Sequence, residues 1–593
     1  MSKDEPEGTS TRSELSAPAL AAVLAASAVS GWLVFSYLVL RDDTPLWDEL
    51  AHALQGALIA HDLRELDWTA LLLDTYTQVY WPPLHSWALA GVFLVAGESL
   101  AVARVVSVLA YVLLAPTLFL TGRTVAPRYG VLAGSIAAAL ALTSPGLIIS
   151  AAQSMLELPG LLALSASTLV YCWLESHPEA SPRAHILLGL GAVLTFLVKS
   201  NYGVLLVVVI VLAKLIEVDF RIRRLATKQT LYAVLPIAVF SVVWFAYPPK
   251  VMWTWNMLVN SSWGGEEARG FSGLLYFPRA IVGFSGSHWM AVVLWAGLIS
   301  AWQARRWPGI AFLAMLPLVL LLIGTFHHTK IPRHILPIFP PLFVLVGMGV
   351  AEVWAFLRSR GSYRQVAAIG VLTGVTVLHA GSLARRDWLP PGPPVAEVLD
   401  HVSLLARENA PVLVLGTRGI RPQPPYIDWH LTGVEELLPV TAADAVMESE
   451  GMRQIVGSIR EAPVPDRLRV SAQRVWGRYY EPSAARSLHV GSQSVATQAQ
   501  FEVAFQEALE RDPPRSVIAL VGTTDTTRYP ASFIEPGLAR AGFRQESVRE
   551  FPRLEISVHL YGRPETVSLP RAEGQHQDRV LARPKGGSRH FPR

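Results

Sequence analysis

Apolar runs separated by short polar segments fill the first two thirds of the chain. Most of them reach or approach the roughly 18 residues at which an apolar stretch is read as a membrane-spanning helix. They lie at residues 18–40, 83–97, 101–121, 129–150, 156–174, 184–198, 203–217, 230–248, 279–301, 308–326, 334–357 and 365–384. The pattern predicts an α-helical, polytopic membrane protein, followed from residue 385 by a part that does not span.

The first apolar run predicts a retained membrane helix. It is longer than the roughly 7–15-residue apolar core of a cleavable signal peptide, and no small-residue cleavage site follows it. Residues 1–17 before it are polar and are expected to form a cytoplasmic tail.

Basic residues in four connecting loops set the expected orientation. Lys and Arg concentrate on the cytoplasmic side of membrane proteins. The loops with such residues are 122–128, 218–229, 302–307 and 358–364. The loops expected outside are then 41–82, 151–155, 199–202, 249–278 and 327–333.

The run 83–97 conflicts with this alternation, because only one crossing fits between the outside loop 41–82 and the inside loop 122–128. It is only about 15 residues long and opens on Pro82-Pro83, which is short for a span. We therefore predict a re-entrant or interfacial helix here. This leaves about 11 spans and places the C-terminal part outside.

Short apolar runs of β character occur at 412–416, 516–522 and 554–560, with a helical pattern over 496–511. Strands that alternate with helices predict a small α/β domain, which we assign to residues 385–568. The tail 569–593 is rich in Pro, Gly and Arg and is expected to be disordered.

Composition supports this picture and excludes several classes of protein. The chain has 593 residues, of which 51% are hydrophobic and 16% charged, against about 25% charged in soluble domains. The net charge of +4 is spread over short loops, so no nucleic-acid partner is indicated. Cys172 is the single cysteine, which excludes an internal disulfide and a Cys-based zinc site.

The first outside loop has the spacing of a short amphipathic helix on the membrane surface. Asp48, His52 and Gln55 share one of its faces, because positions i, i+4 and i+7 align. That face is either a group of functional side chains or a solvated polar face. In the second case Asp48, near the helix start, interacts favourably with the helix dipole.

Two further outside positions carry charge next to apolar runs. Glu157 is a lone carboxylate at the end of a span, which is a functional candidate unless it simply reaches water. Lys199, in a tight turn between two runs, either snorkels to the interface or pairs with an anionic head group.

The loop 327–333 is basic on the side where basic residues are disfavoured. Lys330 and Arg333, followed by His334, suit a phosphate or pyrophosphate group, and a solvated basic loop is the alternative. His52, His327, His328 and His334 lack the close spacing of a metal motif, so no cofactor is certain and a divalent metal is only an alternative. The aromatic loop 249–278 is either an interfacial belt or a substrate-contacting segment.

Residues 18–360 resemble the GT-C class of membrane glycosyltransferases that use lipid-phosphate-linked sugars. The similarity is greatest to the aminoarabinose-transferase and protein-O-mannosyltransferase branch. Its motifs fall on Asp48-Glu49, Pro82-Pro83-Leu84, Glu157, Lys199 and the run from Lys330 to Pro337. Four positions depart from the family pattern: Trp81 replaces a lysine, Ser200-Asn201 replaces Gly-Pro, and His334 replaces a tyrosine.

The resemblance implies a GT-C-like fold and an inverting transfer of a sugar from a polyprenyl-phosphate donor to an extracytoplasmic lipid, glycan or protein. Asp48 would be the general base and Glu157 would orient the acceptor or share that duty. The expected substrate-binding residues are Glu49, His52, Lys199, Lys330, Arg333 and His334. The enzyme would be a multi-pass protein of the inner or plasma membrane, surrounded by lipids, with its active site outside.

Two other functions fit the residues in part. A transporter or flippase of lipid-linked sugars would favour charges deep in the spans and inverted repeats. A non-catalytic envelope assembly protein would not need two acids and an outer basic cluster. Consumption of a polyprenyl-phosphate sugar by the purified protein distinguishes the three.

Overall fold

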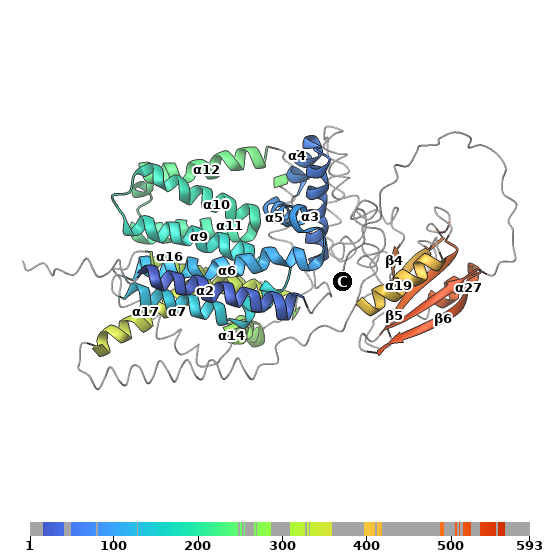
Figure 1. Ribbon diagram of the computed structural model, residues 1–593. Coiled ribbons are helices and arrows are strands. Elements are labelled where there is room, and N and C mark those ends of the chain that lie inside the picture. The colour runs from blue at the N-terminus through green and yellow to red at the C-terminus, as the bar shows by residue number, and fades with distance from the viewer. Residues whose placement is uncertain are drawn as a thin grey trace, which may run out of the picture.

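The computed structural model shows a helical bundle, a group of three helices at one end of it and a separate β-sheet (Figure 1). The residues it describes are 16–40, 49–78, 81–126, 129–246, 250–251, 254, 266–267, 270–285, 309–326, 329–330, 332–358, 396–409, 412–417, 487–490, 505–506, 509, 514–522, 534–552 and 556–563. The predicted tails 1–17 (apart from its last two residues) and 569–593, and the apolar run 365–384, lie outside this set.

The helices of the bundle follow the apolar runs. They are α2 (Ser16–Val34) with the π-helical η1 (Phe35–Val39), α6 (Leu100–Val125), α7 (Gly130–Thr143), α8 (Pro145–Ala151), α9 (Glu157–Ser176), η2 (Pro182–His185), α10 (Ile186–Val198), α11 (Ser200–Glu217), η3 (Ile222–Leu225), α12 (Lys228–Trp244), α14 (Gly270–Ser285), α16 (Ile310–Phe326), η4 (Pro332–Ile338) and α17 (Phe339–Arg358). Side-chain caps fix several starts. Ser99 accepts from the Val102 amide before α6, and Thr227 accepts from the Thr230 amide before α12.

Among the described residues, five helices are long and apolar enough to cross a membrane, or six if one bent pair counts as a span. The pair is α7 and α8, which the apolar run 129–150 did not distinguish. They meet at an angle of 59° where Ser144 precedes Pro145, because proline excludes the preceding residue from helical backbone. The chain is a helical membrane protein, while the total of about 11 spans stays a prediction.

The site-bearing and basic loops lie at opposite ends of the bundle. At one end Glu49 bonds to Arg104 near the start of α6, and Lys199 at the start of α11 bonds to Glu157 at the start of α9. At the other end the Ser176 hydroxyl reaches the Thr124 carbonyl, so α6 and α9 also end together. Exposed basic residues at that second end include Arg123, Arg183, Arg221, Arg223, Arg224 and Lys228. This segregation is the one that the loop charges predicted.

Three further helices, α3 (Glu49–Arg64), α4 (Trp68–Thr77) and α5 (Pro83–Ala96), lie together at the first end (Figure 1). Near the start of α5, the ring of His85 contacts the ring of His52 on α3. Just after the end of α5, Glu98 accepts a hydrogen bond from Arg64 at the end of α3. Both ends of α5 therefore lie at the same end of the bundle, as expected for a re-entrant or interfacial helix. With 14 residues, α5 is also below the length of a span.

Helix α3 differs from the predicted amphipathic surface helix. Its two expected polar residues, His52 and Gln55, are each 2% exposed, and its Ala57 and Ile59 are fully buried. Helix α3 packs closely on α5, where a Cβ on Gly56 would lie 2.4 Å from the Cβ of Leu89. A solvated polar face is therefore excluded for His52 and Gln55.

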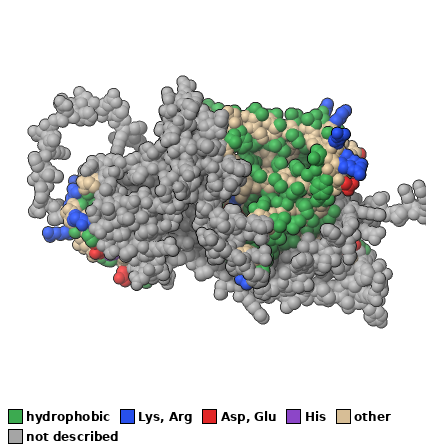
Figure 2. All heavy atoms as spheres, turned by 180° about the vertical axis from the view of Figure 1, so that it is seen from behind, with side chains coloured by type: hydrophobic (Ala, Val, Ile, Leu, Met, Phe, Trp, Pro, Cys, Tyr) green, Lys and Arg blue, Asp and Glu red, His purple; other side chains and the backbone are tan. Residues whose placement is uncertain are grey.

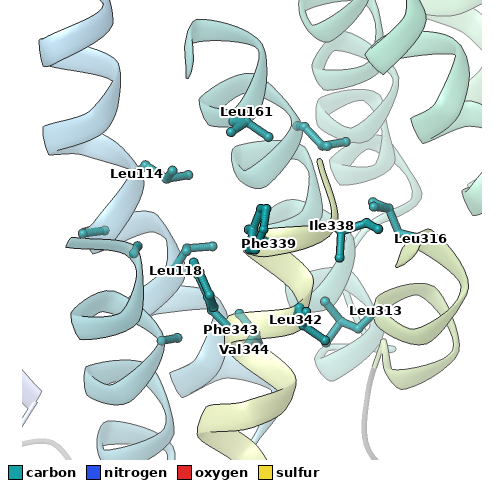
Figure 3. Packing of buried hydrophobic residues seen from close by; sticks show 14 of the residues in the cluster. Leu114, Leu118, Leu161, Leu313, Leu316, Ile338, Phe339, Leu342, Phe343 and Val344 are labelled. Atoms are coloured by element: carbon teal, nitrogen blue, oxygen red, sulfur yellow. The ribbon is translucent and has the colours of Figure 1, made fainter. Parts of the chain in front are cut away.

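The centre of the bundle is built around α17. Phe339 and Phe343 of this helix point toward Leu114 and Leu118 of α6 and toward Leu161 of α9 (Figure 3). A Cβ on Gly347 would lie 2.1 Å from the Ala133 carbonyl oxygen, so α17 and α7 touch through their backbones. This dense core fixes the ends of α6, α9 and η4, which carry the site.

The outer surface of the bundle is apolar, as a lipid-facing surface requires. Figure 2 shows this surface with charged side chains gathered at one end. Exposed apolar side chains on it include Leu187 and Leu194 of α10 and Leu231, Val242 and Val243 of α12.

The C-terminal part contains a five-stranded sheet with strand order β4-β3-β5-β7-β6. The strands are β3 (Val412–Thr417), β4 (Ser487–Val490), β5 (Ser516–Gly522), β6 (Arg544–Phe551) and β7 (Ile556–Gly562), with helices α19 (Ala396–Asn409) and α27 (Ile534–Arg540). β3 is parallel to β4 and β5, whereas β7 is antiparallel to β5 and β6. Residues 517–520 are fully buried, so β5 is apolar on both faces.

The three strands predicted from the sequence are confirmed, and the sheet adds β4 and β6. Of the helical pattern at 496–511, only residues 505, 506 and 509 are described. The boundaries 385–568 and the extracytoplasmic location stay predictions.

Candidate active site

One buried carboxylate and two partly buried cations form a triad at the end of the bundle where α9 and α11 begin. Glu157 is 4% exposed, and its Oε1 lies 2.8 Å from the Lys199 Nζ and 3.6 Å from the Arg333 Nε. Its second oxygen, Oε2, is buried and has no hydrogen-bond partner. Glu157 therefore does not reach water, and Lys199 does not simply snorkel.

Local structure explains why these three side chains meet. Glu157 is the first residue of α9, where the helix dipole favours a negative charge. Lys199 has extended backbone between α10 and α11 and belongs to neither helix. Arg333 lies in η4, whose following residues are anchored in the core.

Gly160 permits the close approach of α9 to α11. A Cβ at this position would lie 2.9 Å from the Cδ2 of Tyr202 and 3.2 Å from the Cβ of Lys199. The Lys199 Nζ in turn lies 4.8 Å from the centroid of the Tyr202 ring, close enough for a cation–π interaction.

Two histidines border the triad. The ring of His52 lies edge-on to Trp81 at 4.8 Å and edge-on to His85 at 5.3 Å. His52 Nδ1 and both ring nitrogens of His85 are buried without a hydrogen-bond partner. Burial lowers the pKa of His52 to about 3, with Glu157 opposing the shift and Arg333 adding to it, so the imidazole is neutral at physiological pH.

A second buried ion pair lies next to the triad but differs from it in that both of its carboxylate oxygens are occupied. Glu49, the first residue of α3, accepts from Arg104 Nε at 3.0 Å and from Arg104 Nη2 at 2.9 Å. Its Oε1 also accepts from the Ser154 amide at 2.5 Å. This pair fixes the start of α3 to α6 and to the segment that leads into Glu157. Acceptance of substrate by Glu49 stays a prediction.

A buried lysine lies outside the triad, where α4 meets the end of α12. Lys250 is 1% exposed and donates to the Tyr76 carbonyl, with the rings of Tyr76 and Trp244 3.7 and 3.2 Å from its Nζ. Burial lowers its pKa to about 6.

The structure thus brings four of the predicted site residues together: His52, Glu157, Lys199 and Arg333. Lys330 is placed only through its backbone in β2 (Thr329–Lys330), which pairs with β1 (Glu266–Glu267). His334 is exposed. Asp48, His327 and His328 lie outside the described residues. The site roles of all these residues stay predictions.

Sequence reasoning missed His85, Tyr202 and Arg104. His85 directly follows the Pro-Pro-Leu motif, and Tyr202 lies three residues after Lys199. Arg104 offered the clearest signal, since an arginine inside an apolar run needs a buried partner. No group of three or more metal-ligating side chains occurs within the described ranges.

The site can be compared with known proteins. The dolichyl-phosphate-mannose-protein mannosyltransferase family pattern matches residues 81–245, which include His85, Arg104, Glu157, Lys199 and Tyr202. The undecaprenyl phosphate-α-4-amino-4-deoxy-L-arabinose arabinosyl transferase 2 of Pseudomonas fluorescens (strain Pf0-1) is 32% identical over 93 residues. That match covers 15% of this chain and only 16% of the relative's length.

A structural likeness extends over nearly the whole chain. ArnT from Cupriavidus metallidurans bound to undecaprenyl phosphate has a TM-score of 0.50 and 15% identity, covering 91% of this chain and 97% of that one. The apo state of the same protein also gives a TM-score of 0.50, covering 92% of this chain and 98% of that one. The resemblance to GT-C glycosyltransferases is confirmed. The chain shares their membrane fold, and its reaction and substrates are treated below as proposals.

Proposed function

We propose that this protein is a membrane glycosyltransferase that moves a sugar from a polyprenyl-phosphate donor to an extracytoplasmic acceptor with inversion. The observation that carries the proposal is the triad of Glu157, Lys199 and Arg333 at one end of the bundle. A single carboxylate faces two cations there, so the triad has positive charge to offer an anionic ligand.

Lys199 and Arg333 bind the donor phosphate in this proposal. The bond that breaks joins the sugar C1 to the phosphate oxygen, and the phosphate leaves with the electron pair. Fixed positive charge stabilises that leaving group, so no acid has to protonate it. Lys330, three residues before Arg333, adds a third charge.

Asp48 acts as the general base. The acceptor hydroxyl or amine attacks C1 from the side opposite the phosphate and loses its proton to the Asp48 carboxylate. The adjacent Glu49 is held by Arg104 and the Ser154 amide, which fixes the chain beside Asp48 relative to the segment before Glu157. The free Oε2 of Glu157 orients the acceptor.

The test is donor turnover by the purified protein in detergent, with envelope lipids and glycans as acceptors and release of polyprenyl phosphate as the readout. Asp48→Asn is expected to lower the rate by about 100-fold or more, the usual contribution of a general base. Arg333→Met should weaken donor binding. Glu179→Gln, an exposed acid at the opposite end of the bundle, is the control and should keep full activity.

Two results would contradict the proposal. One is full activity of the Asp48→Asn variant while it remains folded. The other is a wild-type protein that moves lipid-linked sugar across liposome membranes without consuming it, which would identify a transporter.

A further inference from the structure

Four buried polar atoms beside the triad have no hydrogen-bond partner. They are Nδ1 of His52, Nδ1 and Nε2 of His85, and the hydroxyl of Tyr202. The three side chains are only 2%, 2% and 3% exposed. A buried polar atom without a partner costs about 1–3 kcal/mol, and such atoms are few in native proteins. Their gathering in one place therefore calls for a ligand.

The neighbouring residues show that this part of the fold pairs its polar groups where no ligand is needed. Ser86, next to His85 in the chain, bonds to Gln78 at 2.8 Å and to Gln55 at 3.3 Å. These three side chains are also buried. The polar side chain next to His85 is thus paired within the protein, whereas both ring nitrogens of His85 are not.

The chemistry of the three side chains indicates an uncharged, hydroxyl-rich ligand. A neutral imidazole offers one donor and one acceptor, and a phenol offers both as well. Sugar hydroxyls have the same dual character. A phosphate only accepts, so it is better served by Lys199 and Arg333 than by neutral rings.

We propose that His52, His85 and Tyr202 form the subsite that binds the hydroxyl groups of the donor sugar, directly beside the cations that hold its phosphate. This inference rests on the proposed function. The donor sugar is favoured over a sugar acceptor because Lys199 stands against both Tyr202 and Glu157, so the phosphate and the attached sugar occupy adjoining places.

The test measures the affinity of detergent-purified protein for two probes: polyprenyl phosphate alone, and polyprenyl phosphate carrying mannose or 4-amino-4-deoxyarabinose. Tyr202→Phe removes only the hydroxyl, and His85→Leu removes both ring nitrogens. Each should weaken binding of the sugar-bearing lipid about 5- to 100-fold, the equivalent of one or two lost hydrogen bonds. Binding of polyprenyl phosphate should change less than about twofold.

Lys199→Met is the matched comparison, since it should weaken both probes. His85→Asn, which keeps one donor and one acceptor, should recover part of the preference for the sugar. The thermal midpoint of each variant verifies folding, and Tyr202→Phe changes the fewest atoms.

The outcomes separate the two proposals. If the wild type binds neither probe, both the proposed function and the proposed donor-sugar subsite are refuted. If the wild type binds both but Tyr202→Phe and His85→Leu keep its sugar preference, only the subsite is refuted. Equal weakening of both probes also refutes it, as does loss of acceptor affinity with unchanged donor affinity, which would assign these residues to the acceptor.

Discussion

The Glu49–Arg104 pair gives the sharpest test of how the site is held. Both side chains are essentially buried, at 0% and 1% exposure, and two hydrogen bonds of 3.0 and 2.9 Å join them. Arg104→Met removes the two guanidinium hydrogen bonds from a buried carboxylate, and Glu49→Gln removes the negative charge that faces a buried guanidinium. Removing one partner of such a pair typically costs about 3–5 kcal/mol.

The double variant should cost far less than the sum of the two single variants, because the two opposite charges are then removed together. We expect about 3–5 kcal/mol of coupling between the two sites. The exposed pair Arg64–Glu98, at 43% and 15% side-chain exposure, is the control. Arg64→Met should cost only about 0–1 kcal/mol.

The assay is thermal unfolding of detergent-purified protein followed by tryptophan fluorescence, together with donor turnover. Arg104→Met should lower both the thermal midpoint and kcat, because the pair positions α3 and the chain next to Asp48. Arg104→Lys should recover only part of the loss, because lysine lacks the planar two-point donor. If Arg104→Met costs no more than Arg64→Met, or if the two single effects simply add, the argument is refuted.

Three further predictions concern single positions. Gly160→Ala should lower turnover about tenfold by displacing the buried ring of Tyr202, whereas Gly91→Ala, with open space around its Cβ, should leave turnover unchanged; equal effects would refute the steric argument. Lys250 has a pKa of about 6 against the usual 10.5, so the unfolded state binds more protons between these values and stability rises with pH. From pH 6.5 to 9 the wild type should gain about 1–3 kcal/mol that Lys250→Met does not gain, and equal slopes would contradict this. His52 has a pKa of about 3 against the usual 6.5, so it should stay neutral from pH 5.5 to 8 and donor affinity should not change with pH in that range. The unfolded state binds more protons than the folded state between these pKa values, so stability falls as pH falls from 6.5 to 4, and His52→Asn should lessen that fall. A change of donor affinity near pH 6.5 that His52→Asn abolishes would contradict this.

Much of the fold could be predicted from the sequence because its signals are local. Apolar runs gave the helices of the bundle, and the Pro82-Pro83 start and short length of 83–97 indicated that α5 does not cross. The bend between α7 and α8 was missed although Pro145 marks it. The reason is that helix hydrophobicity is continuous across the break, and only the backbone restriction at Ser144 reveals it.

The site was predictable where charge appears against the local trend. Glu157, Lys199 and Arg333 stood out because each is an ionisable residue beside an apolar run, on the side that the loop charges predict to face outside. His85 and Tyr202 did not stand out, because a histidine or tyrosine on an apolar helix is ordinary in sequence. Only the three-dimensional arrangement shows that their polar atoms lack partners.

The two buried carboxylates, Glu49 and Glu157, differ in their hydrogen bonding. Glu49 accepts hydrogen bonds from Nε and Nη2 of Arg104 and from the Ser154 amide. Glu157 instead faces two cations and keeps Oε2 unpaired, with unpaired ring and phenol atoms around it. A buried ion pair whose hydrogen bonds are satisfied, such as Glu49–Arg104, is disrupted at a high free-energy cost. A buried oxygen without a partner, such as Glu157 Oε2, is stabilised when a ligand donates a hydrogen bond to it. Ser154 and Glu157 belong to one short segment. The Glu49–Arg104 pair, through its hydrogen bond from the Ser154 amide, therefore also restrains the backbone that leads to Glu157.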